Sequence, residues 1–260
     1  MAPSVTLQSG NVLGVKVSAV NLAQAVDIID DTIEVGPPGY VCVAPAHSIM
    51  ECWRDSEVKS IFNRSALVTP DGMSLVWMLR MQGYRHVTRV YGPDLMRAVL
   101  QRTDKEGRLH FLYGSTERIL TSLRDRLNQD YPKSKILGSI APPFRALTAD
   151  EDAALIDEID RAAPDVVWVG LGSPKQERWM AQHRDRLKAP VLIGVGAAFD
   201  FLSGEKPQAP LWMQRSGTEW LFRLATEPRR LWPRYRQYPL FVLLVLAQML
   251  GLRKYPISED

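Results

Sequence analysis

The sequence predicts an α/β protein whose parallel sheet carries helices on both faces. Apolar segments of strand length alternate with segments of helical character over roughly 200 residues, which is the signature of consecutive βαβ units. Residues 166–169, Val-Val-Trp-Val, are apolar at every position, as in a strand that is buried on both faces. No internal repeat or low-complexity linker interrupts this alternation.

Each element has a local signal that sets its limits. Strands end at glycine or proline clusters, and two helices are expected to begin at capping boxes, Thr148 with Glu151 and Ser173 with Gln176. The expected strands are residues 12–17, 40–43, 66–68, 109–113, 135–138, 166–169 and 191–194. The expected helices are residues 22–34, 47–63 with a break near 55, 73–81, 92–106, 117–130, 150–162 and 174–186, and an apolar segment follows at 199–202.

Composition is that of an ordinary globular protein of the cytoplasm. The two cysteines, Cys42 and Cys52, lie in unlike settings and predict no disulfide framework, which indicates a reducing compartment. The N-terminus lacks the basic region and apolar core of a signal peptide. Eight Lys and Arg face four Asp and Glu from residue 211 onward, so the basic character of the chain belongs to its C-terminal segment.

This C-terminal segment, residues 208–260, differs in character from the preceding chain. Arginines alternate with tryptophan and tyrosine, and an apolar run follows at 240–252. A helix that spans a bilayer needs about 20 apolar residues, so the run fits a buried core helix or a helix in the membrane interface. The flanking arginines and aromatic residues favour the interface. No nucleic-acid recognition motif is present, so no nucleic-acid partner is expected.

The turn after residues 166–169 is a candidate anion site. Gly170 and Gly172 allow a tight turn between the strand and the next helix, and free backbone N–H groups at such a helix start bind phosphates in open α/β sheets. The same residues also suit a well-capped turn that binds nothing.

Two charged side chains before residue 100 are candidates for chemistry. Asp71 follows a short apolar strand, where burial would raise its pKa toward that of a general base and the next helix would oppose the rise; alternatively it caps that helix. Arg89 has the planar fork that suits a diphosphate, or it forms a surface ion pair with Asp94. Arg223, Arg230 and Arg234 lie near helical spacing, so they would share a helix face toward phosphate, lipid headgroups or solvent.

Several other chemistries are excluded by spacing. No Cys or His pattern matches a zinc site, and Asp150 and Asp152 lie in the first turn of a helix, where they stabilise its dipole rather than bind a metal nucleotide. No nucleophile elbow or Walker loop occurs, and the turn at Gly170 lacks the third glycine of a dinucleotide fingerprint.

Several segments together resemble one family, the WecG/TagA/CpsF glycosyltransferases (glycosyltransferase family 26). The likeness extends in matching order over about residues 12–250. The matching segments are VTPDGM at 68–73, RVYGPDL at 89–95, VGLGSPKQERW at 169–179, GVGAAFDF at 194–201, EWLFRL at 219–224 and EPRRLW at 227–232.

The resemblance implies a Rossmann-like catalytic domain, residues 1–207, with a helical appendage, residues 208–260, that docks on the membrane and closes over the active site. It implies an inverting, metal-independent enzyme without a cofactor that moves a hexose-type sugar from a UDP-sugar to a polyprenyl-diphosphate-linked saccharide. Such an enzyme acts in exopolysaccharide or cell-envelope glycan synthesis, peripherally on the inner face of the bacterial cytoplasmic membrane.

The resemblance also assigns roles to residues. Asp71 matches the catalytic base, and the donor or its diphosphate is assigned to Arg89, Gly172, Gln176, Gly196, Arg223, Arg230 and Arg234. Many relatives carry a Thr-x-Asn pattern where this chain has Val43, Ala44 and Pro45. His47 or Ser48 is a candidate substitute, and Asp200 is a further candidate for lining the site.

The sequence is also compatible with two other functions. The absent Thr-x-Asn pattern permits a catalytically impaired, membrane-associated scaffold of a polysaccharide assembly. The α/β pattern with glycine turns also permits an NAD-dependent sugar dehydrogenase, although the incomplete dinucleotide fingerprint argues against it.

Overall fold

The computed structural model describes residues 7–257, and the chain forms two compact units. The first unit combines the described parts of residues 1–22, 44–91 and 209–260, and the second combines residues 23–43 and 92–208. The chain therefore passes between the units several times, and the C-terminal segment belongs to the same unit as residues 44–91.

The second unit contains a parallel sheet, as the sequence predicts. Its strands pair in the order β3-β8-β7-β5-β6, and every pairing is parallel. The central strands are apolar and fully buried because helices cover both faces. The strands are β3 (Gly39–Ala44), β5 (Leu109–Gly114), β6 (Lys135–Ile140), β7 (Val166–Gly170) and β8 (Val191–Gly194).

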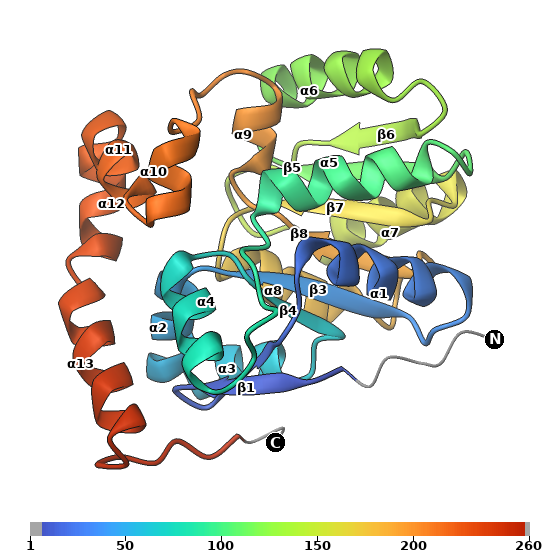
Figure 1. Cartoon of the computed structure of the whole chain (residues 1–260). Coiled ribbons are helices and arrows are strands. Elements are labelled where there is room, and N and C mark those ends of the chain that lie inside the picture. The colour runs from blue at the N-terminus through green and yellow to red at the C-terminus, as the bar shows by residue number, and fades with distance from the viewer. Residues whose placement is uncertain (1–6, 258–260) are drawn as a thin grey trace. The chain divides into compact units, whose positions relative to one another are not determined.

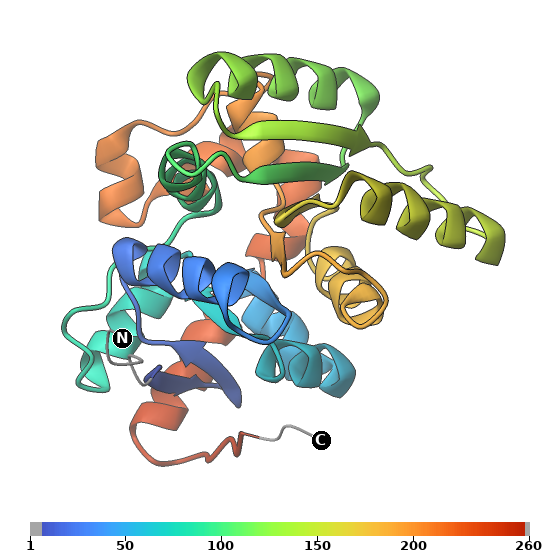
Figure 2. The same cartoon turned by 90° about the vertical axis from the view of Figure 1, so that its right-hand side faces the viewer.

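Helices α7 and α8 lie on one face of this sheet, and α1 and α5 lie on the other (Figures 1 and 2). Helix α7 begins at the predicted capping box of Thr148 and Glu151, in which both reciprocal hydrogen bonds are present. The helices of the second unit are α1 (Leu22–Glu34), α5 (Gly92–Thr103), α6 (Glu117–Asp130), α7 (Ala149–Ala162), α8 (Lys175–His183) and α9 (Ala198–Leu202).

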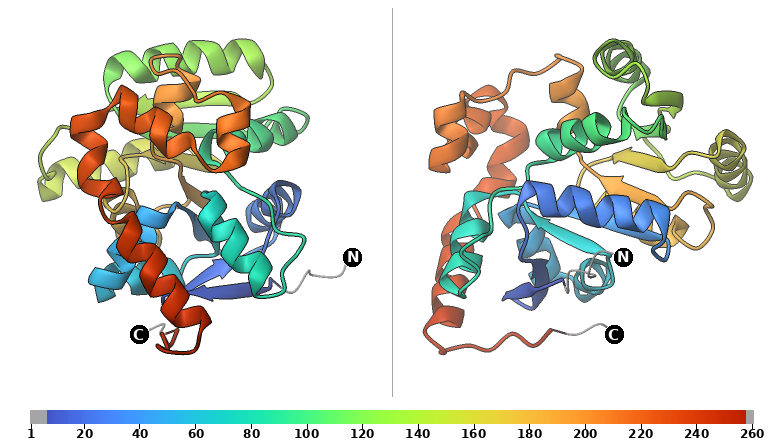
Figure 3. Two further views of the ribbon diagram at one scale, coloured as in Figure 1. Left: turned by 60° about the vertical axis from the view of Figure 1, so that its left-hand side comes forward. Right: turned by 45° about the vertical axis from the view of Figure 1, so that its right-hand side comes forward.

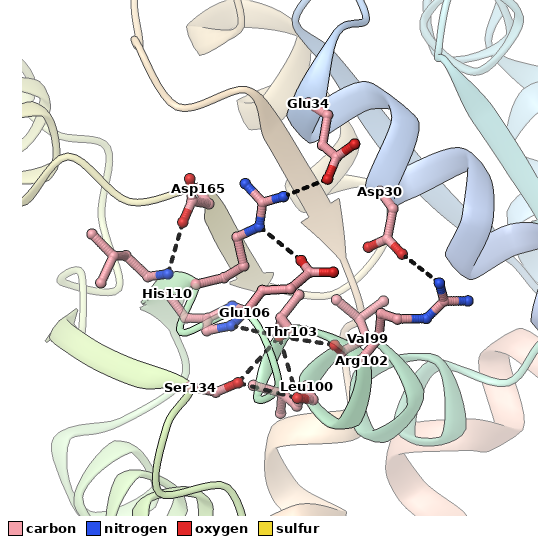
Figure 4. Close-up of polar contacts among 12 residues, drawn as sticks. Asp30, Glu34, Val99, Leu100, Arg102, Thr103, Glu106, His110, Ser134 and Asp165 are labelled. Carbon is pink, nitrogen blue, oxygen red and sulfur yellow. Dashed lines mark hydrogen bonds and ion pairs between the residues drawn. The ribbon is translucent and has the colours of Figure 1, made fainter. Parts of the chain in front are cut away.

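A buried polar network joins α5 to the sheet (Figure 4). The indole Nε1 of Trp168 donates to His110 Nδ1 at 3.2 Å, and His110 Nε2 lies 3.0 Å from the Thr103 hydroxyl. The Trp168 bond leaves the His110 proton on Nε2, which fixes the ring as a donor to Thr103. Burial lowers the pKa of His110 to about 3, so the network is neutral and is satisfied without a charge.

The first unit contains an N-terminal hairpin, one further strand and the helices of the C-terminal segment. Strand β4 packs against β2, and α4 packs against β1 and β4. Its elements are β1 (Ser9–Val12), β2 (Val15–Ser18), α2 (Ala46–Arg54), α3 (Ser56–Asn63), β4 (Leu67–Pro70), α4 (Met73–Met81), α10 (Leu211–Ser216), α11 (Glu219–Thr226), α12 (Pro228–Tyr235) and α13 (Tyr238–Met249).

Two sequence-based predictions about this unit are wrong. Residues 12–17 form a tight hairpin rather than one strand, because Leu13 and Gly14 both adopt positive φ and reverse the chain. The tail arginines do not share one helix, because α11 ends at Thr226 and Pro228 starts α12.

The C-terminal helices are attached to the rest of the first unit along α13 (Figure 3). Phe241 and Leu244 are buried, and α13 packs against α2. At the other end of α13 the side chain of Gln248 accepts from Leu13 N at 2.9 Å and donates to Asn11 O at 3.0 Å. Within residues 7–257, no helix has the length and apolar composition needed to cross a membrane.

Glycines form the carboxyl ends of three neighbouring strands in the second unit. Gly114, Gly170 and Gly194 end β5, β7 and β8, and Gly114 pairs directly with Gly170. A Cβ on Gly114 would lie 2.6 Å from the backbone carbon of Gly170, and Gly114 has a φ of +121°. This position therefore requires glycine both for its conformation and for the close approach of two strands.

Gly114→Ala should destabilise the protein by about 2–4 kcal/mol, because backbone strain adds to a clash with an immovable main chain. Gly107→Ala is the matched control: Gly107 also has a positive φ, +70°, but a Cβ added there would lie 4.0 Å from its nearest neighbour, the backbone oxygen of Lys133. Urea denaturation of both variants would separate the cost of backbone strain, which both share, from the cost of the clash with Gly170, which only Gly114→Ala has. Equal losses of stability would show that the strand approach contributes nothing.

Candidate active site

A pocket in the first unit brings together residues from α2, α4, α11, α12 and α13 and the segments around them. Its charged side chains are Asp71, Arg89, Glu219 and Arg223. Its apolar wall comes from α4 and the C-terminal helices, and includes Trp77, Trp220, Phe241 and Val242. The pocket thus has a charged end beside an aromatic end, as sites for amphipathic ligands do.

Asp71 is placed by the end of β4. Its backbone N–H donates to Ala44 O at 3.2 Å, and Val90 N donates to Pro70 O at 2.9 Å, so main-chain bonds hold both sides of this turn. Gly72, not Asp71, occupies the N-cap of α4, and no side chain caps that helix. The capping alternative for Asp71 is therefore wrong, and its carboxylate faces the pocket.

Arg89 is held on three sides. Its Nε donates to the backbone oxygen of Asp71, and its Nη2 lies 3.4 Å from Asp71 Oδ1 and 2.6 Å from Glu219 Oε2. Its guanidinium also lies over the ring of Tyr91, 4.0 Å from the centroid, as in a cation–π contact. The alternative pairing of Arg89 with Asp94 is not observed, since Asp94 pairs with Arg97.

The electrostatics of the pocket give Asp71 the character of a base near neutral pH. Burial raises the pKa of Asp71 to about 6, Arg89 opposes this rise, and the negative charge of Glu219 adds to it. A carboxyl group with a pKa in this range is ionised at pH 7 and still basic enough to accept a proton. Asp71 and Glu219 together raise the pKa of Arg89 despite its burial.

The tail arginines differ in their surroundings. Arg223 lines the pocket, whereas Arg230 on α12 is exposed and pairs with Glu227 through Nε at 2.6 Å. Burial lowers the pKa of Arg234, and the positive charges of Arg230 and Arg223 lower it further. Arg234 is thus close enough to Arg230 and Arg223 to be repelled by both, and a bound anion would relieve this repulsion.

His47 lies on α2 near Arg223 and Arg234, and Ser48 follows it on the same helix; neither residue lines the pocket. Burial lowers the pKa of His47 to about 3, with Arg234 and Arg223 contributing, so the imidazole is neutral. Ser48 is completely buried. Of Val43, Ala44 and Pro45, only Pro45 lines the pocket, and Ala46, the next residue, lines it as well.

The candidates Gly172, Gln176 and Gly196 form a group of their own in the second unit. Gln176 is buried and accepts from Gly172 N at 3.1 Å, and a Cβ on Gly196 would lie 3.5 Å from the same Gln176 oxygen. The predicted Ser173–Gln176 capping box is wrong, because α8 starts at Lys175 and its N-cap, Pro174, makes no side-chain bond. Gln176 instead joins the two glycine turns.

Asp200 lies in the first turn of α9 in the second unit, where it pairs with Lys206 at 3.3 Å. In the described part of the chain, no three His, Cys, Asp or Glu side chains gather as a metal site would require.

Sequence reasoning missed several residues of the pocket. The sequence presents Glu219 only as part of a matching segment, and it places the tyrosines of the C-terminal segment, Tyr235 and Tyr238 among them, at the membrane interface. These tyrosines pack with Trp220 at centroid distances of 6.1 and 6.2 Å and line the pocket. One signal was available for Glu219: it is an acidic residue at a helix start within a strongly basic segment.

The fold and the pocket define an α/β protein with a buried carboxylate and arginines in one cavity. The chain belongs to the glycosyl transferase WecG/TagA/CpsF family, whose model matches residues 10–255. The resemblance seen in the sequence is thereby confirmed, the protein is a glycosyltransferase, and the dehydrogenase alternative is set aside.

Two similar proteins come from Bacillus. The chain is 31% identical over 195 residues to the N-acetylglucosaminyldiphosphoundecaprenol N-acetyl-beta-D-mannosaminyltransferase of Bacillus subtilis (strain 168), covering 75% of this chain and 74% of that protein. It is 28% identical over 207 residues to the protein of the same name from Bacillus spizizenii (strain ATCC 23059 / NRRL B-14472 / W23), covering 80% and 78%. Both relatives are named for transfer to a diphosphoundecaprenol-linked sugar.

The raised pKa of Asp71 predicts a pH-dependent effect of Asp71→Asn on stability. The pKa of Asp71 in the folded protein, about 6, exceeds the ordinary aspartate value of 3.8. The stabilising contribution of Asp71 is therefore complete below pH 3.8 and is lost as pH rises through 6. Relative to wild type, Asp71→Asn should therefore gain stability between pH 4.5 and 7.5, by on the order of 2 kcal/mol.

Urea denaturation across this pH range would measure the trend. Asp157→Asn, which removes an exposed carboxylate on α7, is the control and should show little change with pH. If the difference in free energy of unfolding between Asp71→Asn and wild type stays constant with pH, the pKa of Asp71 is not raised in the folded protein.

Proposed function

We propose that the protein transfers a hexose-type sugar from a UDP-sugar to a polyprenyl-diphosphate-linked saccharide, with inversion and without a metal. The observation that carries this proposal is the Asp71 carboxylate, with a pKa of about 6, in a pocket it shares with Arg89 and Arg223. Both Bacillus relatives are named for an acceptor of this kind.

In the proposed reaction, the acceptor hydroxyl oxygen attacks the anomeric carbon of the donor sugar. Asp71 accepts the proton of that hydroxyl, the new glycosidic bond forms, and the bond from the anomeric carbon to the phosphate oxygen breaks. UDP leaves with the electron pair of that bond. A single displacement of this kind inverts the configuration, and a positioned base contributes about 10²–10⁴ in rate.

The negative charge that develops on UDP requires stabilisation, which a metal supplies in other enzymes. Arg223 and Arg234 suit this task, since both are partly buried, Arg223 lines the pocket, and Arg234 lies close enough to Arg223 for that charge to lower its pKa. Fixed cations in a shielded site stabilise developing charge more strongly than they would in water. We assign Arg89 and Arg230 to the same task, and Gly172, Gln176 and Gly196 to the donor.

The donor and acceptor named for the relatives are the first pair to test. These are an N-acetylmannosaminyl donor, as its UDP derivative, and N-acetylglucosaminyl-diphosphoundecaprenol. The aromatic wall of Trp77, Trp220 and Phe241 beside Asp71 is suited to the sugar and lipid parts of such an acceptor.

Membrane attachment is proposed to occur through the C-terminal helices. Helix α13 is apolar, yet only Phe241 and Leu244 of its side chains are buried. Leu243, Leu250 and Leu252 are 64%, 72% and 77% exposed, and Arg253 and Lys254 follow them. Apolar side chains beside cations are the signature of an interfacial helix. The enzyme would then act on the inner face of the cytoplasmic membrane.

Asp71→Asn should lower turnover by at least about 10²-fold, because the amide cannot accept the acceptor proton. Transfer would be assayed with EDTA present, using UDP-N-acetylmannosamine and the diphosphoundecaprenol-linked acceptor, and UDP affinity would be measured by calorimetry. Affinity should change little, since the arginines remain. Asp157→Asn serves as the surface control. Unchanged turnover would exclude Asp71 as the base, and no transfer by wild type with any UDP-sugar would favour the scaffold alternative.

Leu243→Glu combined with Leu250→Glu should abolish flotation of the enzyme with vesicles that contain anionic lipid. Both side chains are exposed and neither lines the pocket, so the variant should fold and bind UDP normally. Phe144→Glu is the matched control, because Phe144 is 95% exposed but lies in the second unit. Flotation that depends equally on Phe144 would contradict an attachment through α13.

A further inference from the structure

Glu219 is a buried carboxylate that lines the pocket, and the reaction proposed above does not use it. It is the first residue of α11, it is 8% exposed, and it lines the same pocket as Asp71. An acidic residue at a helix start is stabilised by the helix dipole. That role requires no particular neighbour, however, and an exposed position would serve it equally well.

The contacts of Arg89 show what distinguishes Glu219. A single nitrogen, Arg89 Nη2, lies between two carboxylates, 2.6 Å from Glu219 Oε2 and 3.4 Å from Asp71 Oδ1. The shorter contact is to Glu219, so Asp71 does not hold that nitrogen alone. The backbone oxygen of Asp71 accepts from Arg89 Nε, which fixes the guanidinium on the other side.

A base that shares a cation with a second carboxylate behaves differently from one that holds the cation alone. An isolated pair with Arg89 would stabilise the ionised form of Asp71 and make it a weak base. A second negative charge beside the same cation offsets much of that stabilisation. Other groups also surround Asp71: Arg223 from α11, Tyr91 beside Arg89, Tyr235 from α12 and Tyr238 from α13. The nearby His47 of α2 is neutral.

We propose that Glu219 is a positioning residue of the transfer reaction. Its carboxylate shares the guanidinium of Arg89 with Asp71, holds that guanidinium in place, and leaves Asp71 basic enough to take the acceptor proton. This inference rests on the proposed function, in which Asp71 is the base, and it assigns to the C-terminal segment a part in proton transfer as well as in anion binding.

Glu219→Gln tests the inference through the pH dependence of kcat/KM. In wild type the acidic limb should reflect the Asp71 pKa of about 6. Loss of the second negative charge should move this limb about 1 unit lower, and kcat at pH 8 should fall several-fold because a weaker base removes the proton less readily. KM for the donor should change less than kcat. Glu219→Asp, which keeps the charge but shortens its reach, should give an intermediate shift.

Glu34→Gln is the matched control. Glu34 pairs with Arg108 at 2.9 Å in the second unit (Figure 4). The variant therefore removes the same charge and a similar ion pair, but from residues that do not line the pocket. Its acidic limb should coincide with that of wild type.

A direct titration separates this inference from the proposed function. The carboxyl carbon of Asp71 would be followed by NMR in enzyme labelled with ¹³C-aspartate, with Asp71→Asn identifying the resonance. A lower titration midpoint in Glu219→Gln supports the inference even if no transfer is detected. An unmoved midpoint and an unmoved acidic limb would overturn it while leaving Asp71 as the base. If Glu219→Gln does not fold, the same two measurements on Glu219→Asp, the titration midpoint of Asp71 and the acidic limb of kcat/KM, test the inference instead.

Discussion

The ionic contact of Arg89 with two carboxylates is the interaction on which the candidate site depends. Charged groups are rarely buried unless they are paired, and here one guanidinium compensates Asp71 and Glu219 while it also stacks on Tyr91. These groups come from segments far apart in the sequence. Removing Arg89 would leave two carboxylates without this shared cation, and such a change is costly in a protein interior.

This dependence explains why the C-terminal segment belongs to the same compact unit as residues 44–91. Helix α11 supplies Glu219 and Arg223 to the pocket, and α13 supplies Phe241 and Val242 to its wall. The bonds of Gln248 to the N-terminal hairpin fix the far end of α13. The segment is therefore a structural part of the pocket, and its remaining apolar surface is free to serve the proposed attachment to lipid.

The second unit meets a different constraint at the carboxyl ends of its strands. Gly114, Gly170 and Gly194 let the backbones and the Gln176 side chain approach more closely than any Cβ would allow. Gln176 is held there by Gly172 and Glu177 rather than by a helix cap. Proteins often place such tightly packed, glycine-rich turns where a backbone must approach a ligand, which is consistent with the donor role proposed for them.

The sequence by itself determined the α/β class, the approximate position of most elements and the family. These rest on local periodicity, glycine and proline signals, and matching segments, all of which are properties of neighbouring residues. It also singled out Asp71 and Arg89, though without deciding between a general base and a helix cap for Asp71, or between diphosphate binding and a surface ion pair for Arg89. The Thr148 capping box was predictable for the same reason, since its partners lie three residues apart.

Only the tertiary structure decided what surrounds those residues. The 2.6 Å contact between Arg89 and Glu219 joins residues 130 positions apart in the chain, and no local pattern encodes such a pairing. The same limit applies to the hairpin at Leu13 and Gly14, where backbone conformation outweighed an apolar run, and to Gln176, whose amide bonds Gly172 instead of capping α8. Burial and charge proximity set the basicity of Asp71, and both arise only when distant segments pack together.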